Sequence, residues 1–349
     1  MNTKIYLIAS LISISTLLKA QVGSVGDFFG GGSENAALLF ESYFAPWVNA
    51  LGADLNAGWY NTAKSHKLGG FDISLVALSM SFVPEQDKTF DLNDLNLQDV
   101  TFPGGNESPT AAGDKSGAKE IFYNPIPSQP VGVSFESPNG TGVGFMPMPM
   151  VQVGIGTIKE TDISFRYLPR LSIGDVGKAG LWGIGLKHGI KQWIPAISKI
   201  PVLQIALQGG YTKFSTNFDL NVEPADLGLT GTGVYDNQEF AMELTSFTAN
   251  ILVGAHFPIV DFYGGIGMAS TKANIMLNGN YPIPSTTAPG AAVSVEDPVD
   301  IEVTNSDDVT VKPRMNIGMR VKLGVFTFHG DYTRANYNVV SVGMGFSFR

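Results

Sequence analysis

Histidine is the residue type in this 349-residue chain that could most directly support acid–base or metal chemistry. The four histidines lie far apart and show no metal-ligand spacing: His66, His188, His256 and His329. No GxSxG nucleophile elbow accompanies them. His329 and Asp331 share one face of a predicted strand, but we interpret them as two polar residues that face an interior. The sequence therefore predicts a protein that is not an enzyme and has no cofactor.

Carboxylates gather in two predicted loops, and hard cations such as Ca²⁺ prefer oxygen ligands of this kind. Residues 91–99 contain three aspartates, and a second loop contains Asp297, Asp300, Glu302, Asp307 and Asp308. Neither loop has the EF-hand spacing or its turn glycine. Two interpretations stay open for the second loop, a metal site and a solvated acidic loop, and the pattern favours the solvated loop.

Methionines and arginines on predicted strand faces are the candidates for ligand binding. Three methionines recur at every second position and could form a flexible apolar wall: Met146, Met148 and Met150. The alternative is that they pack against an N-terminal helix. Three arginines on the polar faces of other strands would place positive charge inside a barrel and could steer an anionic group: Arg166, Arg170 and Arg320.

The elements that would position these side chains are strands with two different faces. In the final run, residues 338–349, one face is apolar and aromatic: Val340, Val342, Met344, Phe346 and Phe348. Serines, glycines and one arginine form the other face. Six further segments alternate in the same way, which is typical of strands between lipid and a polar lumen. A soluble β-sandwich is the alternative, but it gives no reason for the connections to be long on one side and short on the other.

The fold class predicted is an all-β membrane protein, an antiparallel up-and-down transmembrane β-barrel of about 12–14 strands over residues 66–349. The twelve expected strands are 66–83, 118–125, 130–137, 143–156, 160–173, 179–191, 200–216, 238–255, 259–277, 313–322, 324–334 and 337–349. The second and third are interrupted by prolines, which cannot donate to a β-ladder. Residues 88–101 or 215–235 could add a hairpin and raise the number to fourteen.

The N-terminal part has a different character. Residues 1–20 have a basic start, a short apolar run and a cleavage point after Ala20, so they predict a secretory signal peptide. Residues 21–65 are expected to form a glycine-rich flexible stretch followed by a helical plug. The helix begins near Ser33 and continues until Pro46, and residues 47–51 could add another turn before Gly52. This piece of about fifteen residues is expected at the periplasmic mouth or inside the barrel.

Composition agrees with an exported barrel in the bacterial outer membrane. There is no cysteine, which excludes disulfides and thiolate chemistry. Charged residues make up 15% of the chain, against about 25% in soluble domains, and there are 41 glycines. The formal charge of −9 argues against nucleic acid as a partner. Outer-membrane lipid is the expected surrounding.

Three stretches resemble a known group of proteins: GWYNTAKSHKLGGFDISL (58–75), LWGIGLKHGIKQWIPAISKIP (181–201) and the final VSVGMGFSFR. Together with Gln21 after the signal, they are similar to an uncharacterised family of Bacteroidota outer-membrane barrels, distantly similar to the long-chain fatty-acid channels. The resemblance implies a barrel with an N-terminal plug and passage of hydrophobic compounds. The chain departs from those channels in lacking their NPA-like plug motif, of which Asn61-Thr62-Ala63 is at most a remnant.

Two functions follow from these expectations. The first is a passive channel or binder for small hydrophobic molecules, based on the plug, the methionines and the resemblance. The second is a non-transporting accessory subunit of a larger envelope assembly, such as a secretion or surface-protein complex, in which the acidic loops supply contacts with protein partners.

Overall fold

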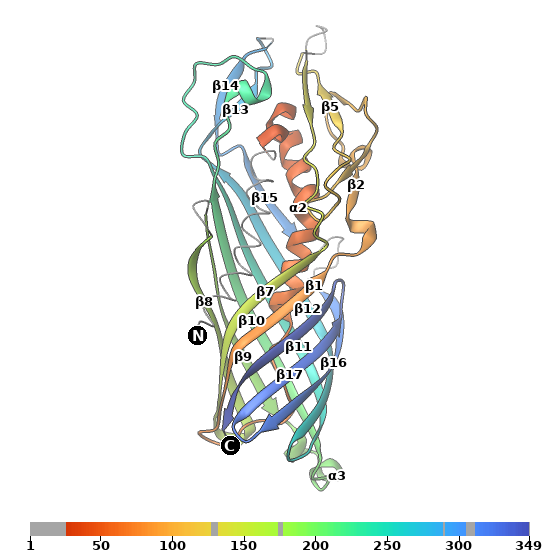
Figure 1. Cartoon of the computed structure of the whole chain (residues 1–349), viewed down its shortest axis with the longest axis vertical. Helices are drawn as coiled ribbons and strands as arrows, with labels where there is room; N and C mark the ends of the chain where they lie inside the picture. Colours follow the sequence, from red (N-terminus) through yellow and green to blue (C-terminus); the bar gives the residue numbers. More distant parts are fainter. Residues whose placement is uncertain (1–25, 127–131, 174–176, 289, 305–310, 349) are drawn as a thin grey trace.

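A computed structural model describes residues 26–126, 132–173, 177–288, 290–304 and 311–348, and it contains a closed antiparallel barrel of ten strands (Figure 1). The strands are β1 (Phe71–Phe82), β7 (Phe145–Gly156), β8 (Thr161–Ile173), β9 (Gly177–Gly189), β10 (Leu203–Asp219), β11 (Glu239–His256), β12 (Val260–Asn278), β16 (Lys312–Leu323), β17 (Phe326–Arg334) and β18 (Asn338–Phe348). The barrel closes where β18 pairs with β1, placing Phe348 opposite Phe71.

The fold class is confirmed, but the number of strands, predicted as twelve to fourteen, is ten. The two proline-flanked segments do not enter the barrel. They form β5 (Glu120–Tyr123) and β6 (Val133–Glu136), which join β3 (Val100–Thr101) in a separate three-stranded sheet. Residues 88–101 and 215–235 add no hairpin to the barrel either. Prolines flank both segments and remove donors from the ladder there, and the two strands that form between them have only four residues each.

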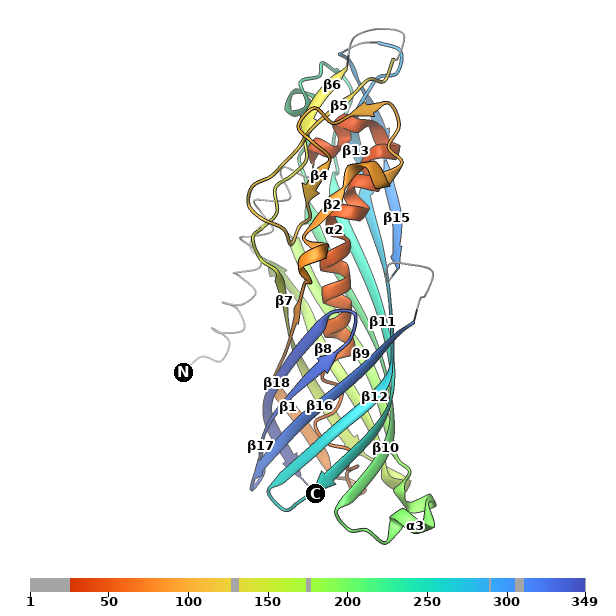
Figure 2. The same cartoon turned by 90° about the vertical axis from the view of Figure 1, so that its right-hand side faces the viewer.

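Strand length divides the barrel into two levels. β16, β17 and β18 have 12, 9 and 11 residues, close to the 9–11 or so that cross a bilayer. In contrast, β10, β11 and β12 have 17, 18 and 19 residues. Figure 2 shows these long strands rising past the short ones toward the end that carries the long connections. The outward residues of β10 change at the same level, from Leu207 and Tyr211 to Lys213, which pairs with Glu243 at 2.9 Å.

The inward face changes character at the same level. Beside the apolar belt, β10 turns Gln208 and Thr212 inward, whereas further up it turns Phe214 and Phe218 inward, and all four are buried. The lower barrel is therefore apolar outside and polar inside. The upper barrel is polar outside and apolar inside, like a soluble protein, because its outer surface lies above the lipid belt.

The upper lumen is filled by the N-terminal helix. η1 (Gly26–Gly31) lies at the long-connection end, and α2 (Gly32–Asn56) runs from it down into the barrel (Figures 1 and 2). The structure therefore places the predicted plug inside the barrel. The helix has 25 residues rather than about fifteen, because it continues through Pro46, which is buried. The aromatic side chains of Phe40, Tyr43 and Phe44 belong to the core that joins α2 to the wall.

Two groups of long connections cover the helix at the upper end. One contains η2 (Glu85–Asp87), β2 (Thr89–Asp91), η3 (Leu92–Leu95), β3, β4 (Glu107–Pro109), β5 and β6; the other contains η6 (Pro224–Leu227), β13 (Asn280–Pro284), β14 (Ala292–Glu296) and β15 (Val299–Thr304). The opposite end has short turns with η4 (Ile158–Glu160), η5 (Lys191–Trp193) and α3 (Pro195–Ser198). None of the helices in the described part of the chain has the length and apolarity to cross a membrane.

Candidate functional site

The lower lumen is occupied by residues 57–70, which connect the end of α2 to the start of β1, and buried charged side chains of the wall hold them. Arg166 of β8 is fully buried. Its guanidinium donates to the carbonyls of Leu55 at 3.0 Å and Ala57 at 2.7 Å, and to Gln152 Oε1 at 2.7 Å. The same guanidinium lies 3.7 Å from the ring centre of Trp59. Arg166 therefore satisfies carbonyls at the end of the helix that have no partner within it.

A second arginine approaches the same helix end from β16. Arg314 is 6% exposed, and its Nη1 donates to the carbonyl of Asn56 at 2.5 Å and to Thr248 Oγ1 at 2.8 Å. Positive charge is favourable at a helix C-terminus, where the last carbonyls carry partial negative charge. Two guanidinium groups from β8 and β16 thus fix the lower end of the plug.

Below them, Arg320 of β16 binds the connecting segment. Its Nε donates to Asp261 Oδ2 at 2.7 Å, and its Nη1 donates to Asn61 Oδ1 at 3.1 Å. Asp261 also contacts His256, whose Nε2 lies 2.8 Å from Lys64 Nζ. This chain of contacts runs from Asn61 of the segment through three wall residues and returns to the segment at Lys64.

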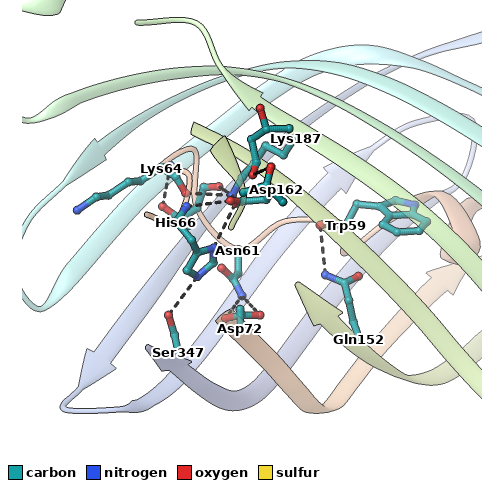
Figure 3. A network of polar contacts seen from close by, with 12 residues as sticks. Trp59, Asn61, Lys64, His66, Asp72, Gln152, Asp162, Lys187 and Ser347 are labelled. Carbon is teal, nitrogen blue, oxygen red and sulfur yellow. Dashed lines mark hydrogen bonds and ion pairs between the residues drawn. The ribbon is translucent and has the colours of Figure 1, made fainter. Parts of the chain in front are cut away.

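Figure 3 shows a further network, around Asp162 of β8. Asp162 accepts from the backbone N–H of His66 at 2.9 Å, lies 3.2 Å from His66 Nδ1 and forms an ion pair with Lys187 at 3.1 Å. Lys187 also donates to the carbonyls of Thr62 and Lys64. Wall charges and backbone groups of the plug therefore satisfy one another, as buried charges require.

Three residues of this network, Ser347, His66 and Asp162, contact one another in the order serine–histidine–aspartate that hydrolytic triads have. Ser347 Oγ lies 3.4 Å from His66 Nε2, and His66 in turn contacts Asp162. However, Ser347 is 3% exposed and lies outside the cavity of about 760 Å³ that His66 lines. Asp162 is also shared with Lys187. We interpret the three as a structural contact between the wall and the plug, and the expectation that the protein is not an enzyme stays a prediction.

The other sequence candidates also have structural partners. Asp331 accepts from Tyr263 at 3.3 Å and Thr333 at 3.4 Å on the lumen side, and His329 lies opposite Arg320 on the neighbouring strand. Met148 and Met150 are buried in the core that contains α2, and Met146 packs against it. The methionines therefore face the helix, which is the alternative that the sequence left open.

The prediction that Arg170 faces the lumen is wrong, because its side chain lies on the outer face of the barrel. It is exposed, and its Nη2 donates to Ser215 Oγ at 3.3 Å on the outer face of β10. The cause is a register shift between Leu168 and Leu171, where the pairing of β8 with β9 skips two residues. A bulge of this kind redirects the side chains that follow it.

The acidic loop forms no cation site in the residues that the structure describes, where no three ligating side chains converge. Asp297 accepts from the backbone N–H of Gly279 at 2.7 Å, and Glu302 pairs with Lys272 at 2.5 Å. Asp300 is exposed. The remaining two members of the predicted set, Asp307 and Asp308, lie outside the described residues.

Sequence reasoning missed several residues that hold the plug. Arg314, Asp261, Asp162 and His66 were not among the candidates. Arg314 could have been found, because extending the alternation of Arg320, Gly318 and Asn316 toward the strand's start places it on the same inward face. The partners of His66 could not have been found, because Asp162 lies 96 residues away and Ser347 lies 281 away.

Comparisons with known proteins place the chain in a family. It belongs to DUF6588, a family of unknown function, whose model matches residues 1–348. No curated protein matches it.

Similar solved structures include barrels of several kinds. The attachment invasion locus protein Ail of Yersinia pestis, solved with the heparin analogue sucrose octasulfate, is 8% identical, covers 80% of this chain and 99% of its own, and has a TM-score of 0.27. The translocator domain of the autotransporter NalP of Neisseria meningitidis is 11% identical over 81% and 90%, with a TM-score of 0.30. A mutant of the monoaromatic hydrocarbon channel TodX is 9% identical over 85% and 75%, with a TM-score of 0.30.

Proposed function

We propose that this protein is a plugged outer-membrane barrel that does not transport and that presents an ordered module at the cell surface as an accessory subunit of an envelope assembly. One observation carries the proposal. The guanidinium groups of Arg166, Arg314 and Arg320, which would line an open polar channel, all bind the plug. The short-turn end is assigned to the periplasm, as in other barrels of this class.

If the plug left the lumen, the wall would lose the hydrogen-bond partners of its buried arginines. Each of these three arginines is 6% exposed or less. Leaving a buried donor without its hydrogen-bond acceptor costs about 1–3 kcal/mol, and more when the donor is charged. In an opened lumen water would replace part of that loss, but several such contacts would break together. A plug held in this way favours a barrel that stays closed.

The module at the upper end is built around the same helix, which supports a role in contacts with other proteins. Asn35 of α2 donates to the carbonyl of Gln98 at 2.9 Å and accepts from its N–H at 2.8 Å. Tyr43 donates to the carbonyl of Asn139 at 2.9 Å and accepts through its backbone from Ala111. The plug therefore supports the surface connections as well as closing the lumen.

Two measurements on the full-length protein test this function. In planar bilayers we expect no steady ion conductance, and crosslinking at native expression should recover protein partners bound to residues of the long connections. A second barrel of known open lumen serves as the positive control for conductance. Steady conductance by the wild type, or recovery of the barrel alone after crosslinking, would contradict the proposal.

A seam in the wall favours a second candidate, the passage of small hydrophobic molecules. β7 pairs with β8 only from Val151 to Gly156, so its residues from Phe145 to Met150 have no partner on β8. Pro147 and Pro149 lie in this part of β7, and Pro169 lies on β8. Because proline has no N–H to donate, the seam cannot close as a complete ladder.

The test of this candidate uses the absence of cysteine in the chain. A disulfide between Pro149→Cys and Pro169→Cys would join the two edges of the seam. If the seam is the route, oxidation should lower uptake of a monoaromatic hydrocarbon by intact cells, and reduction should restore it. Uptake that is equal in both states, in a sample in which the disulfide has formed, removes this candidate.

A further inference from the structure

The outer wall of the barrel contains a groove on the lipid-facing side of β10, β11, β12 and β16. Its volume is about 930 Å³. Five large apolar side chains line it, each at least 45% exposed: Leu207, Ile251, Ile266, Met268 and Met315. Ala249 lies among them and fills little space, because its side chain is a single methyl group. The groove therefore has the volume and the apolar walls to take an acyl chain.

Cationic side chains stand at the upper end of this groove. Lys312 at the start of β16 and Arg334 at the end of β17 line it, together with Asn336. Within the described part of the chain, neither cation has an ion pair or a side-chain hydrogen bond. No carboxylate is among the described residues that line the groove. Among the residues that the structure describes, no carboxylate therefore offsets the positive charge at this position.

The level of these cations matches the edge of the apolar belt. Lys312 pairs with Ala269 of β12, between Met268, which is 60% exposed, and Lys272, which is exposed and charged. Arg334 ends the nine-residue strand β17 at the long-connection side. In a barrel whose long connections face outward, this is the level of the headgroups of the outer leaflet.

We propose that the groove binds one anionic lipid of the outer leaflet, with an acyl chain along the apolar walls and the phosphate at Arg334 and Lys312. An arginine can bind a phosphate through two parallel hydrogen bonds, and a lysine adds a point charge. A zwitterionic lipid carries a compensating ammonium and gains less from two cations. The groove lies inside the lipid belt, so its occupant must itself be apolar along most of its length.

The test measures lipid binding to the purified full-length protein in a mild non-ionic detergent by native mass spectrometry. The probes are phosphatidylglycerol and phosphatidylcholine with the same acyl chains, and inorganic phosphate as a headgroup without a chain. We expect the wild type to bind phosphatidylglycerol in preference to phosphatidylcholine and to bind inorganic phosphate weakly. Each cation near an anionic lipid contributes about fivefold in affinity, so the double variant Lys312→Gln and Arg334→Gln should lose about 25-fold.

Two further variants distinguish the contribution of the lipid headgroup to the affinity from that of the acyl chain. Arg170→Gln is the matched control, because Arg170 is an exposed cation on β8 outside the groove, and it should bind like the wild type. Ala249→Phe fills the groove without changing charge and should also lower the affinity for phosphatidylglycerol. Equal binding of the two lipids, an unchanged double variant or an unchanged Ala249→Phe variant would overturn the proposal. So would a dimer that buries the groove and excludes the lipid.

Discussion

At the scale of single residues, the polar side chains of the lower lumen act as anchors for the plug. Arg166 and Arg314 bind the last carbonyls of α2 from β8 and β16, and Arg320 binds the segment that follows. Charged groups can be this deeply buried because each has its hydrogen-bond partners in place. The polar lumen that the sequence indicates is thus real, but the guanidinium groups of its three buried arginines are bonded to protein.

Replacing Arg166 with alanine should destabilise the folded barrel by about 3–5 kcal/mol, because Leu55 and Ala57 lose the donor for their carbonyls. The measurement is unfolding in denaturant in a detergent that keeps the barrel folded. Arg170→Ala is the control and should cost at most about 0.5 kcal/mol, since that side chain is exposed. Equal losses in the two variants would show that Arg166 is not an anchor.

Asp27 in η1 should make the upper end sensitive to pH. Burial, with Asp226 and Glu136 nearby, raises the pKa of Asp27 to about 6. Because the folded state favours the protonated acid, this end should be most stable well below pH 4 and should lose stability as pH rises toward 6. Amides of η1 should therefore exchange faster at pH 7.5 than at pH 4.5 after correction for the intrinsic rate. Asp27→Asn should remove this difference, and an equally large difference in that variant would refute the assignment.

At the scale of elements, α2 is a helix whose position the barrel fixes along its whole length. Its start lies at the long-connection end, whereas β1, which follows it in the chain, starts at the short-turn end (Figure 1). The chain therefore crosses the level of the membrane inside the barrel before it forms its first strand. Gly26, the first described residue, therefore lies at the end assigned to the cell surface.

An epitope placed directly before Gly26 should be accessible to antibody on intact cells. A second epitope placed in the short turn at Gly324 is the control and should react only after the cells are permeabilised, because that turn lies at the opposite end. The measurement is antibody binding by flow cytometry. If both epitopes require permeabilisation, the proposed orientation is wrong.

The close approach of α2 to the wall at Gly52 gives a second prediction for this element. A Cβ at Gly52 would lie 2.5 Å from Thr271 Cγ2 and Oγ1. Gly52→Ala should therefore destabilise the barrel by about 1–3 kcal/mol, although alanine favours a helix by about 1 kcal/mol. Adding Thr271→Ala should recover part of the loss in a denaturant titration. Stabilisation by Gly52→Ala alone would show that the helix has room to move.

At the scale of the whole molecule, the barrel has two levels with opposite polarity. Lipid selects apolar outward residues in the lower part, and the polar network holds the plug inside it. Above the belt the outward residues are polar, and the apolar inward residues pack on α2. The protein thus combines a membrane barrel with a globular core that shares the same long strands.

A charge placed on the outer face should distinguish the two levels within one strand. Ile251 and Thr245 lie on the same outward face of β11, six residues apart, and Ile251 is 49% exposed. Ile251→Arg should cost about 2–4 kcal/mol of folding free energy in a bilayer, whereas Thr245→Arg should be close to neutral. Folding into vesicles against denaturant measures both. Equal costs would place the lipid boundary elsewhere.

Features that repeat along a strand could be predicted from the amino-acid sequence. A period of two, with apolar residues on one face, fixed which side chains of β10, β17 and β18 point outward, because alternate side chains of a strand point in opposite directions. The long and short connections showed which ends of the strands lie together. Prolines in residues 118–137 marked the two predicted strands that the barrel excludes.

What fills the lumen, in contrast, depends on contacts between segments that are distant in the sequence. The alternation that turns Arg166 inward does not show that its partners are carbonyls 109 and 111 residues earlier in the chain. The bulge that moves Arg170 outward depends on pairing with β9, and Pro46 stays inside a helix because the wall packs around it. These outcomes depend on contacts between distant segments, whose energies appear only when the barrel closes around the helix. The local propensities of the residues therefore do not predict these contacts.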